Sequence, residues 1–114
     1  MRDDCGGIVR PALGIPDEDF LRGDIPMTKQ EVRILLLAKA AIKPGDVVLD
    51  IGAGTGSIAV EAALQSGDGK VYALEKEAEG IELIRRNAQR FGVENLIALH
   101  GVAPDAMQGL PAAD

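Results

Sequence analysis

The sequence is poor in the residues that build disulfides, metal centres and membrane spans. It contains one cysteine, Cys5, and one histidine, His100, so an internal disulfide is excluded and no cluster has the spacing of zinc ligands. The longest nearly apolar stretch, residues 34–42, is interrupted by Lys39 and is far shorter than the roughly 18 residues that a membrane span requires. We therefore expect no metal site and no membrane association.

Basic residues are also in deficit, because 12 Lys and Arg stand against 18 Asp and Glu, giving a formal net charge of −6. An acidic surface repels phosphate backbones, so we expect no nucleic-acid partner. Residues 1–5 are acidic and lack the apolar core of a secretory signal, which favours a cytoplasmic protein. The length of 114 residues corresponds to one domain.

Residues 1–26 differ from the rest of the chain. They hold three of the six prolines and show no sustained hydrophobic period, which predicts an extended arm with turns. From Thr28 onward the pattern becomes regular, so we divide the chain into an arm over residues 1–26 and a domain over residues 27–114.

A helix is expected over residues 29–41. Thr28 and Glu31 have the spacing of a capping box, in which the Thr28 hydroxyl and the Glu31 carboxylate bond to the free amides of a helix start. The apolar positions that we expect this helix to bury are Val32, Leu35, Leu36 and Ile42.

Strands and helices then alternate along the chain. The expected elements are a strand at 47–51, a helix at 57–65, a strand at 70–74, a helix at 78–91 and a strand at 96–100. This alternation predicts right-handed crossovers and an α/β fold with a parallel sheet in the order 3-2-1. Residues 47–51 have the apolar composition of a central strand, yet this order places them at an edge. We therefore expect an incomplete sheet, the N-terminal half of a larger fold.

A glycine-rich loop, Asp50-Ile51-Gly52-Ala53-Gly54-Thr55-Gly56, follows the first strand. Glycines let the backbone turn sharply and let a ligand approach closely, which predicts a cradle for an adenosine-bearing cofactor. The spacing of the glycines disfavours NAD, because the dinucleotide fingerprint needs two residues between its second and third glycines. A phosphate-binding P-loop is excluded, since no Gly-Lys-Ser/Thr follows.

Two acids accompany this loop. Glu75 ends the second strand, 23 residues beyond Gly52, and its carboxylate could accept hydrogen bonds from two ribose hydroxyls. The alternative is that Glu75 only favours the N-terminus of the next helix. For Asp50 we expect a structural role, in which its carboxylate bonds to loop amides and holds the shape of the loop.

The motif Asp-x-Gly-x-Gly-x-Gly followed by a distant acid resembles S-adenosylmethionine-dependent methyltransferases with a Rossmann-like class I fold. Three further segments, residues 14–20, 25–33 and 101–104, resemble the decarboxylating precorrin or cobalt-precorrin C5,15/C15-methyltransferases of cobalamin biosynthesis. The resemblance covers residues 14 to about 107, and the segment Ile-Pro-Met-Thr-Lys-x-Glu-Val-Arg at residues 25–33 is its most specific part.

This resemblance implies methylation of a tetrapyrrole precursor coupled to decarboxylation of an acetate side chain, with S-adenosylmethionine as the methyl donor. It also implies a homotetramer. The residues that it places at the cofactor are Thr28, Gly52, Ala53, Gly54, Thr55, Gly56, Glu75 and Ala103. Thr28 has an equally weighted alternative role as a helix cap. Relatives usually carry an acid immediately before the alanine at position 103, whereas this sequence has Val102 there, so a carboxylate contact to adenine is missing.

No residue is assigned to catalysis, because a methyl group on a sulfonium is already activated and needs chiefly proximity to its acceptor. His100 is interpreted as an ordinary strand-end residue. A polycarboxylate substrate leads to the hypothesis that some basic residues of the arm and first helix face its acetate and propionate groups. These residues are Arg10, Arg22, Lys29 and Arg33. Two alternatives stay open: a methyltransferase for another small molecule or a protein, and a non-catalytic remnant of the fold.

Overall fold

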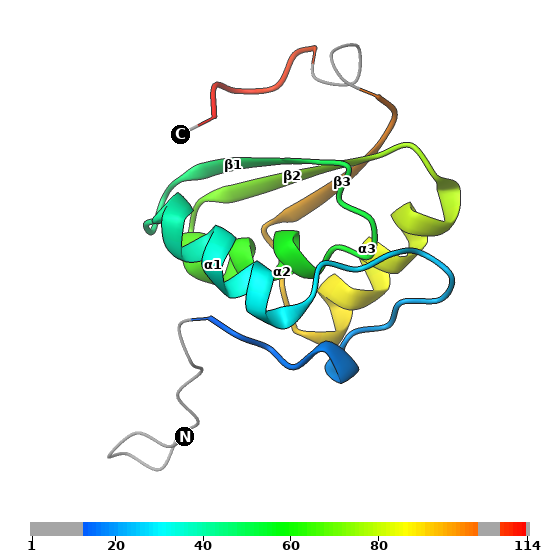
Figure 1. Cartoon of the computed structure of the whole chain (residues 1–114). Coiled ribbons are helices and arrows are strands. Elements are labelled where there is room, and N and C mark those ends of the chain that lie inside the picture. The colour runs from blue at the N-terminus through cyan, green and yellow to red at the C-terminus, as the bar shows by residue number, and fades with distance from the viewer. Residues whose placement is uncertain (1–12, 103–107, 114) are drawn as a thin grey trace.

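The computed structural model describes residues 13–102 and 108–113 (Figure 1). Apart from the short 3-10 helix η1, which was not expected, its helices and strands match those predicted from the sequence, with ends that shift by at most one residue. In chain order they are η1 (Asp17–Asp19), α1 (Gln30–Ala40), β1 (Val47–Ile51), α2 (Ser57–Ser66), β2 (Lys70–Glu75), α3 (Ala78–Arg90) and β3 (Leu96–His100).

The three strands form one parallel sheet in the order β1-β2-β3, so the predicted order is confirmed and β1 lies at an edge. The register places Val48 beside Val71 and Tyr72 beside Ile97. Helices α1, α2 and α3 lie on one face of the sheet (Figure 1). Over the opposite face, in the described chain, passes the segment 108–113, which lines a hollow together with residues of β1 and β2.

The core lies between the helices and the sheet, and α2 occupies its middle. Ala59, Ala62 and Ala63 are almost fully buried against the β2 residues Val71 and Ala73. Small side chains on both surfaces let the helix approach the strands closely, which gives the close packing typical of protein interiors. This helix follows the glycine loop directly, so its packing fixes where the loop leaves the sheet.

Helix α1 buries a different face from the one that we expected. Val32, Leu35 and Leu36 are 51%, 57% and 48% exposed, so their predicted burial is wrong. The buried residues of this helix are Arg33 and Leu37, which are one turn apart. The hydrophobic pattern misleads here because apolar residues occupy both sides of the helix, and only the side with Arg33 and Leu37 meets the rest of the described chain. Ile42, just after the helix, does pack against the core.

The predicted capping box is also wrong. The N-cap residue of α1 is Lys29, and no side chain makes a capping hydrogen bond there. The helix begins one residue later than the box requires, because the first helical bond joins the Arg33 amide to the Lys29 carbonyl oxygen at 2.8 Å. Thr28 therefore precedes the cap position, and its hydroxyl does not serve the helix start.

Residues 13–26 pack against the helices. Phe20 is 5% exposed, and its ring centroid lies 4.9 Å from that of Phe91, just after α3. The Gly14 amide donates a hydrogen bond to Glu61 of α2 at 2.7 Å. These contacts fix the described part of the arm on the helical layer. The division of the chain at residue 26 stays a prediction.

Candidate functional site

The glycine loop turns at the carboxyl edge of the sheet. Gly52, Gly54 and Gly56 have φ angles of +73°, +59° and +86°, in the left-handed region that favours glycine. The amides of Gly52 and Ala53 both donate to the Leu74 carbonyl oxygen at 2.9 Å, which ties the start of the loop to the end of β2. The sharp turn predicted from these glycines is therefore confirmed.

Each glycine of the loop meets different surroundings. A Cβ at Gly54 would lie 3.1 Å from the Pro26 carbonyl oxygen, and a Cβ at Gly56 would lie 3.1 Å from Ile84 Cα. Such spacing is tighter than most real Cβ contacts, so a larger residue at either position would require the neighbouring atoms to move. A Cβ at Gly52 would meet nothing within 4 Å among the residues that the structure describes. At Gly52, then, the open side of the loop is free for a ligand to approach the backbone.

Glu75 joins the loop to the start of α3. Its carboxylate is nearly buried, with the residue 7% exposed. Oε1 accepts a hydrogen bond from the Gly54 amide at 2.9 Å, and Oε2 accepts one from the Glu77 amide at 2.9 Å. The second bond shows that Glu75 does support the start of the next helix, α3, which was the alternative to a role in ligand binding. Both oxygens keep a further lone pair, so the carboxylate can still accept hydrogen bonds from a ligand.

Asp50 does not hold the loop amides, so its predicted structural role is wrong. Leu74 and Glu75 take those amides instead. Asp50 Oδ2 is buried and has no hydrogen-bond partner among the described residues. Burial, and then the nearby charge of Glu75, raise the pKa of Asp50 from 3.8 to about 6. A buried acceptor without a donor is costly, so this oxygen carries an unmet hydrogen bond at the end of β1.

A hollow of about 250 Å³ opens beside these residues. Its walls come from the ends of β1 and β2 and from the chain after β3. The lining residues are Ile51, Gly52, Leu74, Glu75, Lys76, Gly101 and Val102. Most of this lining is apolar, and one carboxylate supplies its hydrogen-bond acceptors, a combination that is typical of small-molecule sites.

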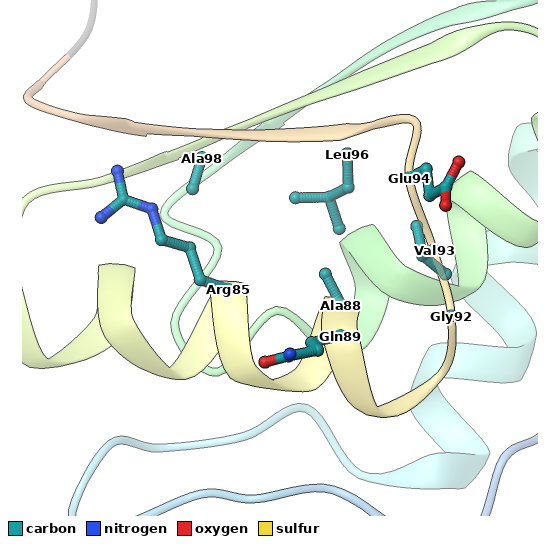
Figure 2. A pocket seen from close by; sticks show the side chains of 8 residues that line it. All are labelled: Arg85, Ala88, Gln89, Gly92, Val93, Glu94, Leu96 and Ala98. Atoms are coloured by element: carbon teal, nitrogen blue, oxygen red, sulfur yellow. The ribbon is translucent and has the colours of Figure 1, made fainter.

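A second hollow, of about 350 Å³, lies between α3 and β3 (Figure 2). Arg85 and Glu94 stand at its rim, and Ala88, Leu96 and Ala98 line it. It contains none of the residues predicted to bind the cofactor. We therefore place the candidate site at the smaller hollow, where the glycine loop and Glu75 meet.

The other predicted cofactor residues lie around the loop. Thr55 is 1% exposed, and its Oγ1 has no partner in the part of the chain that the structure describes. Thr28 is half-buried and follows, two residues later, the Pro26 carbonyl that packs against Gly54. Ala103 lies outside the described residues, as does Arg10.

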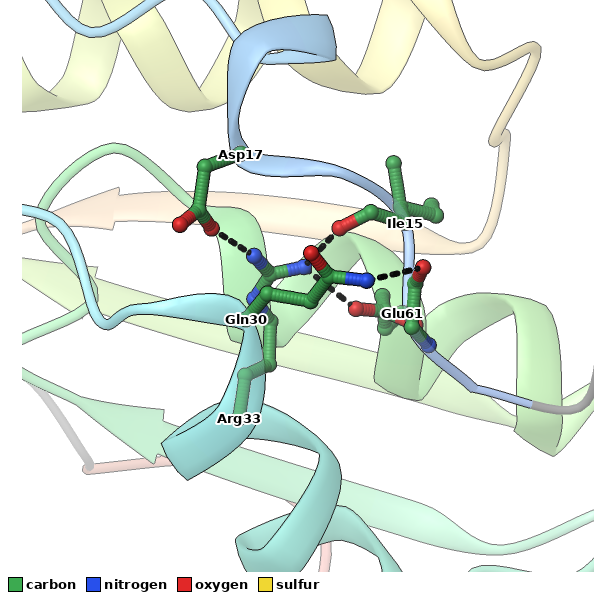
Figure 3. Close-up of polar contacts among 6 residues, drawn as sticks. Ile15, Asp17, Gln30, Arg33 and Glu61 are labelled. Atoms are coloured by element: carbon green, nitrogen blue, oxygen red, sulfur yellow. Dashed lines mark hydrogen bonds and ion pairs between the residues drawn. The ribbon is translucent and has the colours of Figure 1, made fainter.

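Arg33, one of the basic residues expected to face the substrate, is fully buried instead. Its guanidinium bonds to Asp17, to Glu61 Oε2 at 2.6 Å and to the Ile15 carbonyl oxygen at 2.8 Å (Figure 3). It also lies over the ring of Phe20, 4.8 Å from the centroid. The predicted role of Arg33 is therefore wrong, because the side chain is fully buried and its Nη1 and Nη2 groups bond inside the protein. Arg22 and Lys29 are exposed.

Two residues next to the loop were missed by the sequence reasoning. Gly80 of α3 lies against Glu75, since a Cβ there would be 2.6 Å from Glu75 Cγ. Asn87 of α3 is fully buried and donates a hydrogen bond to the Thr55 carbonyl oxygen at 2.9 Å. The sequence signal that could have identified them is their spacing, because positions 80, 84 and 87 share one face of the helix. Gly80 and Asn87 do not stand out in a search for buried apolar residues.

His100 ends β3, and its Nε2 lies 2.8 Å from the Lys76 carbonyl oxygen, which agrees with its interpretation as a strand-end residue. Within residues 13–102 and 108–113, no three His, Cys, Asp or Glu side chains gather as a metal site would need. Over the same ranges, no helix has the length and apolar character to cross a bilayer.

Comparison with known proteins identifies close relatives. A curated protein of Saccharolobus solfataricus, named a probable cobalt-precorrin-6B C(15)-methyltransferase (decarboxylating), is 56% identical over 94 residues, which are 80% of this chain and 47% of that protein. The solved precorrin-6Y C5,15-methyltransferase of Geobacter metallireducens is similar with a TM-score of 0.85 at 34% identity, covering 92% of this chain and 56% of that one. An S-adenosylmethionine-dependent O-methyltransferase of Thermotoga maritima has a TM-score of 0.60 at 27% identity, covering 63% of this chain and 28% of that one.

The chain spans about half the length of the curated relatives it matches. Its three strands and three helices on one face are a partial class I methyltransferase fold, as predicted. A model described as the precorrin methyltransferase domain matches residues 19–114. Together with the Saccharolobus relative, this match confirms the resemblance seen in the sequence, and the chain belongs to the precorrin methyltransferase family.

Proposed function

We propose that these residues form the cofactor-binding part of a methyltransferase of cobalamin biosynthesis. The reaction is transfer of a methyl group from S-adenosylmethionine to a precorrin or cobalt-precorrin, coupled to decarboxylation of an acetate side chain. The observation that carries the proposal is the hydrogen bond of 2.9 Å from the Gly54 amide to Glu75 Oε1, which lies beside the open side of Gly52. The family and the names of the relatives supply the substrate class.

The residues at this edge of the sheet fit the proposed cofactor. The apolar walls of the hollow suit an adenine ring, and the Glu75 carboxylate suits ribose hydroxyls. Asp50 Oδ2, buried without a donor, suits a cationic or N–H group. The residues that we propose to hold the cofactor are Thr28, Gly52, Ala53, Gly54, Thr55, Gly56, Glu75 and Ala103.

When bound, S-adenosylmethionine supplies a methyl group that its sulfonium has already activated. The chain then has to bind, orient and exclude water, and no protein nucleophile is needed. The exposed apolar residues Ile51 and Val102, which are 57% and 54% exposed, line the mouth of the hollow. We propose that the substrate covers them and thereby removes water from the reacting groups.

The proposed substrate carries several carboxylates. Arg22 and Lys29 are exposed, and we propose that they pair with those groups, since charge-assisted hydrogen bonds to carboxylates are strong. The homotetramer implied by the resemblance is likewise a proposal, which sedimentation of the full-length protein measures directly. The cytoplasmic location stays a prediction.

Calorimetry tests the proposal at its first step. The full-length protein should bind S-adenosylmethionine and its demethylated product, and with labelled cofactor it should methylate a cobalt-precorrin with release of carbon dioxide. Absence of binding to either molecule would overturn the cofactor assignment. Binding without methylation of a precorrin, but with methylation of another acceptor, would overturn the substrate.

A pair of glycine substitutions provides a matched control. Gly52 and Gly45 both have positive φ angles, +73° and +90°, so alanine strains the backbone by about 1 kcal/mol at either position. In the described parts of the chain, neither Cβ would meet an atom closer than 3.8 Å. Gly45 lies in the turn before β1, away from the hollow. We expect Gly52→Ala to weaken cofactor binding and Gly45→Ala to leave it unchanged.

A further inference from the structure

One face of α3 supports the glycine loop from behind. Gly80, Ile84 and Asn87 are spaced by four and three residues, so they point the same way from the helix. Gly80 packs against Glu75, and Ile84 packs against Gly56, where a Cβ would lie 3.1 Å away. Asn87 bonds to the carbonyl oxygen of the residue between Gly54 and Gly56. The helix therefore contacts the second half of the loop and the acid that holds it.

Asn87 is the polar member of this face, and it is fully buried. Its Nδ2 donates to the Thr55 carbonyl oxygen at 2.9 Å and to the Leu21 carbonyl oxygen at 2.8 Å. Its Oδ1 accepts from the Leu21 amide at 2.8 Å. Both amide donors are thus used, one on the loop and one on the N-terminal arm. A single side chain joins two segments that are distant in the sequence.

The arm continues from this point along α3 to the loop. Arg90 Nε donates to the Asp19 carbonyl oxygen at 2.7 Å on one side of Leu21. On the other side, the Asp24 amide donates to Glu79 Oε1 at 3.3 Å. The chain then reaches Pro26, whose carbonyl oxygen packs against Gly54. The contacts of Asn87 therefore fix the arm and the loop relative to each other just before Thr28.

We propose that Asn87 is a positioning residue for the cofactor. It lies behind the loop, and it holds the Thr55 carbonyl and the Leu21 backbone so that the loop and the Thr28 segment keep one relative position. This inference rests on the proposed function, since it takes the glycine loop and Thr28 as cofactor-binding. If Asn87 were purely structural, its substitution would lower the stability of the fold but would leave the cofactor affinity of the folded protein unchanged.

The substitution Asn87→Asp tests this role with almost no change in size. The carboxylate cannot donate, so both hydrogen bonds from Nδ2 are lost, and an oxygen faces two carbonyl oxygens. We expect the Kd of the full-length protein for S-adenosylmethionine to rise about tenfold or more, because cofactor binding must then restore a loop position that these two bonds no longer hold. Calorimetry should be run where circular dichroism shows the variant to be folded. Asn87→Ser, which is smaller and still polar, provides a second variant if Asn87→Asp does not fold.

Asn95 offers a matched control at the opposite end of the sheet. Its Nδ2 donates to the Ala63 carbonyl oxygen at 3.0 Å and to the Gly69 carbonyl oxygen at 3.2 Å. Asn95→Asp therefore also removes amide hydrogen bonds to backbone carbonyls, but before β3 rather than behind the loop. We expect it to destabilise the fold while the Kd for S-adenosylmethionine stays within about twofold of the wild type.

A second measurement tests directly whether the loop keeps its hydrogen bonds. Hydrogen exchange of the Gly54 and Gly56 amides, which are bonded to Glu75 and Ala53, should become faster in Asn87→Asp and stay unchanged in Asn95→Asp. An unchanged Kd in folded Asn87 variants, with binding intact in the wild type, would overturn the positioning role and leave the proposed function standing. Failure of the wild type to bind the cofactor or its product would instead overturn the proposed function.

Discussion

Glu75 Oε1 accepts a hydrogen bond from the Gly54 amide at 2.9 Å, which joins the end of β2 to the loop that follows β1. The parallel register brings the two together, because Ile51 pairs with Leu74, one residue before Glu75. The other carboxylate oxygen accepts from Glu77 at the start of α3. One side chain therefore sets both the shape of the loop and the position of the helix behind it.

Glu75→Gln should weaken this junction. A glutamine side chain has one acceptor oxygen where the carboxylate has two, so one of the two backbone amides loses its partner. We expect a loss of about 1–3 kcal/mol in the free energy of unfolding and weaker binding of S-adenosylmethionine. Urea unfolding and calorimetry measure the two effects. Glu77→Gln, at an exposed neighbouring position, is the control, and equal behaviour of the two variants would contradict the role of Glu75.

Gly80→Ala should disturb the same junction from the helix side. Alanine favours a helix by about 1 kcal/mol over glycine, but its Cβ would lie 2.6 Å from Glu75 Cγ and 3.2 Å from the Gly54 carbonyl oxygen. Overlap of this kind costs about 1–3 kcal/mol, so we expect a net loss of stability together with a raised Kd for the cofactor. Glu82→Ala, at an exposed position of the same helix, should do neither. A Gly80→Ala protein more stable than the wild type would show that the packing is looser than the structure indicates.

The sequence predicts most of this fold because its local signals agree. Strands, helices and the parallel order follow from alternating apolar runs and glycine turns, and the same pattern places the glycine loop after β1 and Glu75 at the end of β2. Tertiary contacts decide the rest. Val32 and Leu36 look like core residues because they are apolar, while Arg33 looks exposed because it is charged, and the structure reverses both. A buried charge depends on partners from distant segments, here Asp17 and Glu61, and a hydrophobic pattern carries no information about them.

The same limit applies to the residues behind the loop. Asn87 and Gly80 matter because of what they meet across the fold, at Thr55 and Glu75, rather than because of a local motif. Asp50 shows the opposite error. It belongs to a recognised motif, but the loop amides that we expected it to bind are taken by Leu74 and Glu75, and that outcome depends on the register between two strands.

Arg33→Met should destabilise the protein without a direct effect on substrate contacts. Glu61, whose side chain is 3% exposed, would be left as a buried charge without its partner, which costs about 3–5 kcal/mol. Adding Glu61→Gln removes that charge and keeps an acceptor for the Gly14 amide, so the double variant should recover part of the loss. Urea unfolding of the single and double variants measures this. A loss of less than about 1 kcal/mol in Arg33→Met would contradict the importance of the network.

Asp50→Asn should raise stability at neutral pH. The pKa of Asp50 is about 6 in the folded protein, against its ordinary value of 3.8, so the folded state binds the proton more tightly. The resulting stabilisation is complete below pH 4 and is lost as the pH rises through 6, a difference of roughly 3 kcal/mol. Asparagine stays neutral throughout. The variant should therefore gain stability over the wild type at pH 8 and match it near pH 4, and an equal gain at both would show that charge is not the cause.

Binding of S-adenosylmethionine should release protons near pH 6. Asp50 and Glu75 lie close enough for the charge of Glu75 to raise the pKa of Asp50, and a cation placed between or beside them favours the charged carboxylate and lowers that pKa. At pH 6 about half of the Asp50 carboxyls carry a proton that the cation displaces, whereas at pH 8 almost none do. Calorimetry in two buffers of different ionisation enthalpy should therefore give different apparent enthalpies at pH 6 and equal ones at pH 8. The demethylated product lacks the sulfonium charge and should release fewer protons, and Asp50→Asn should release none from this position. Equal apparent enthalpies in both buffers at pH 6 would mean that no cation binds near Asp50, and the cofactor would then have to lie farther from the end of β1.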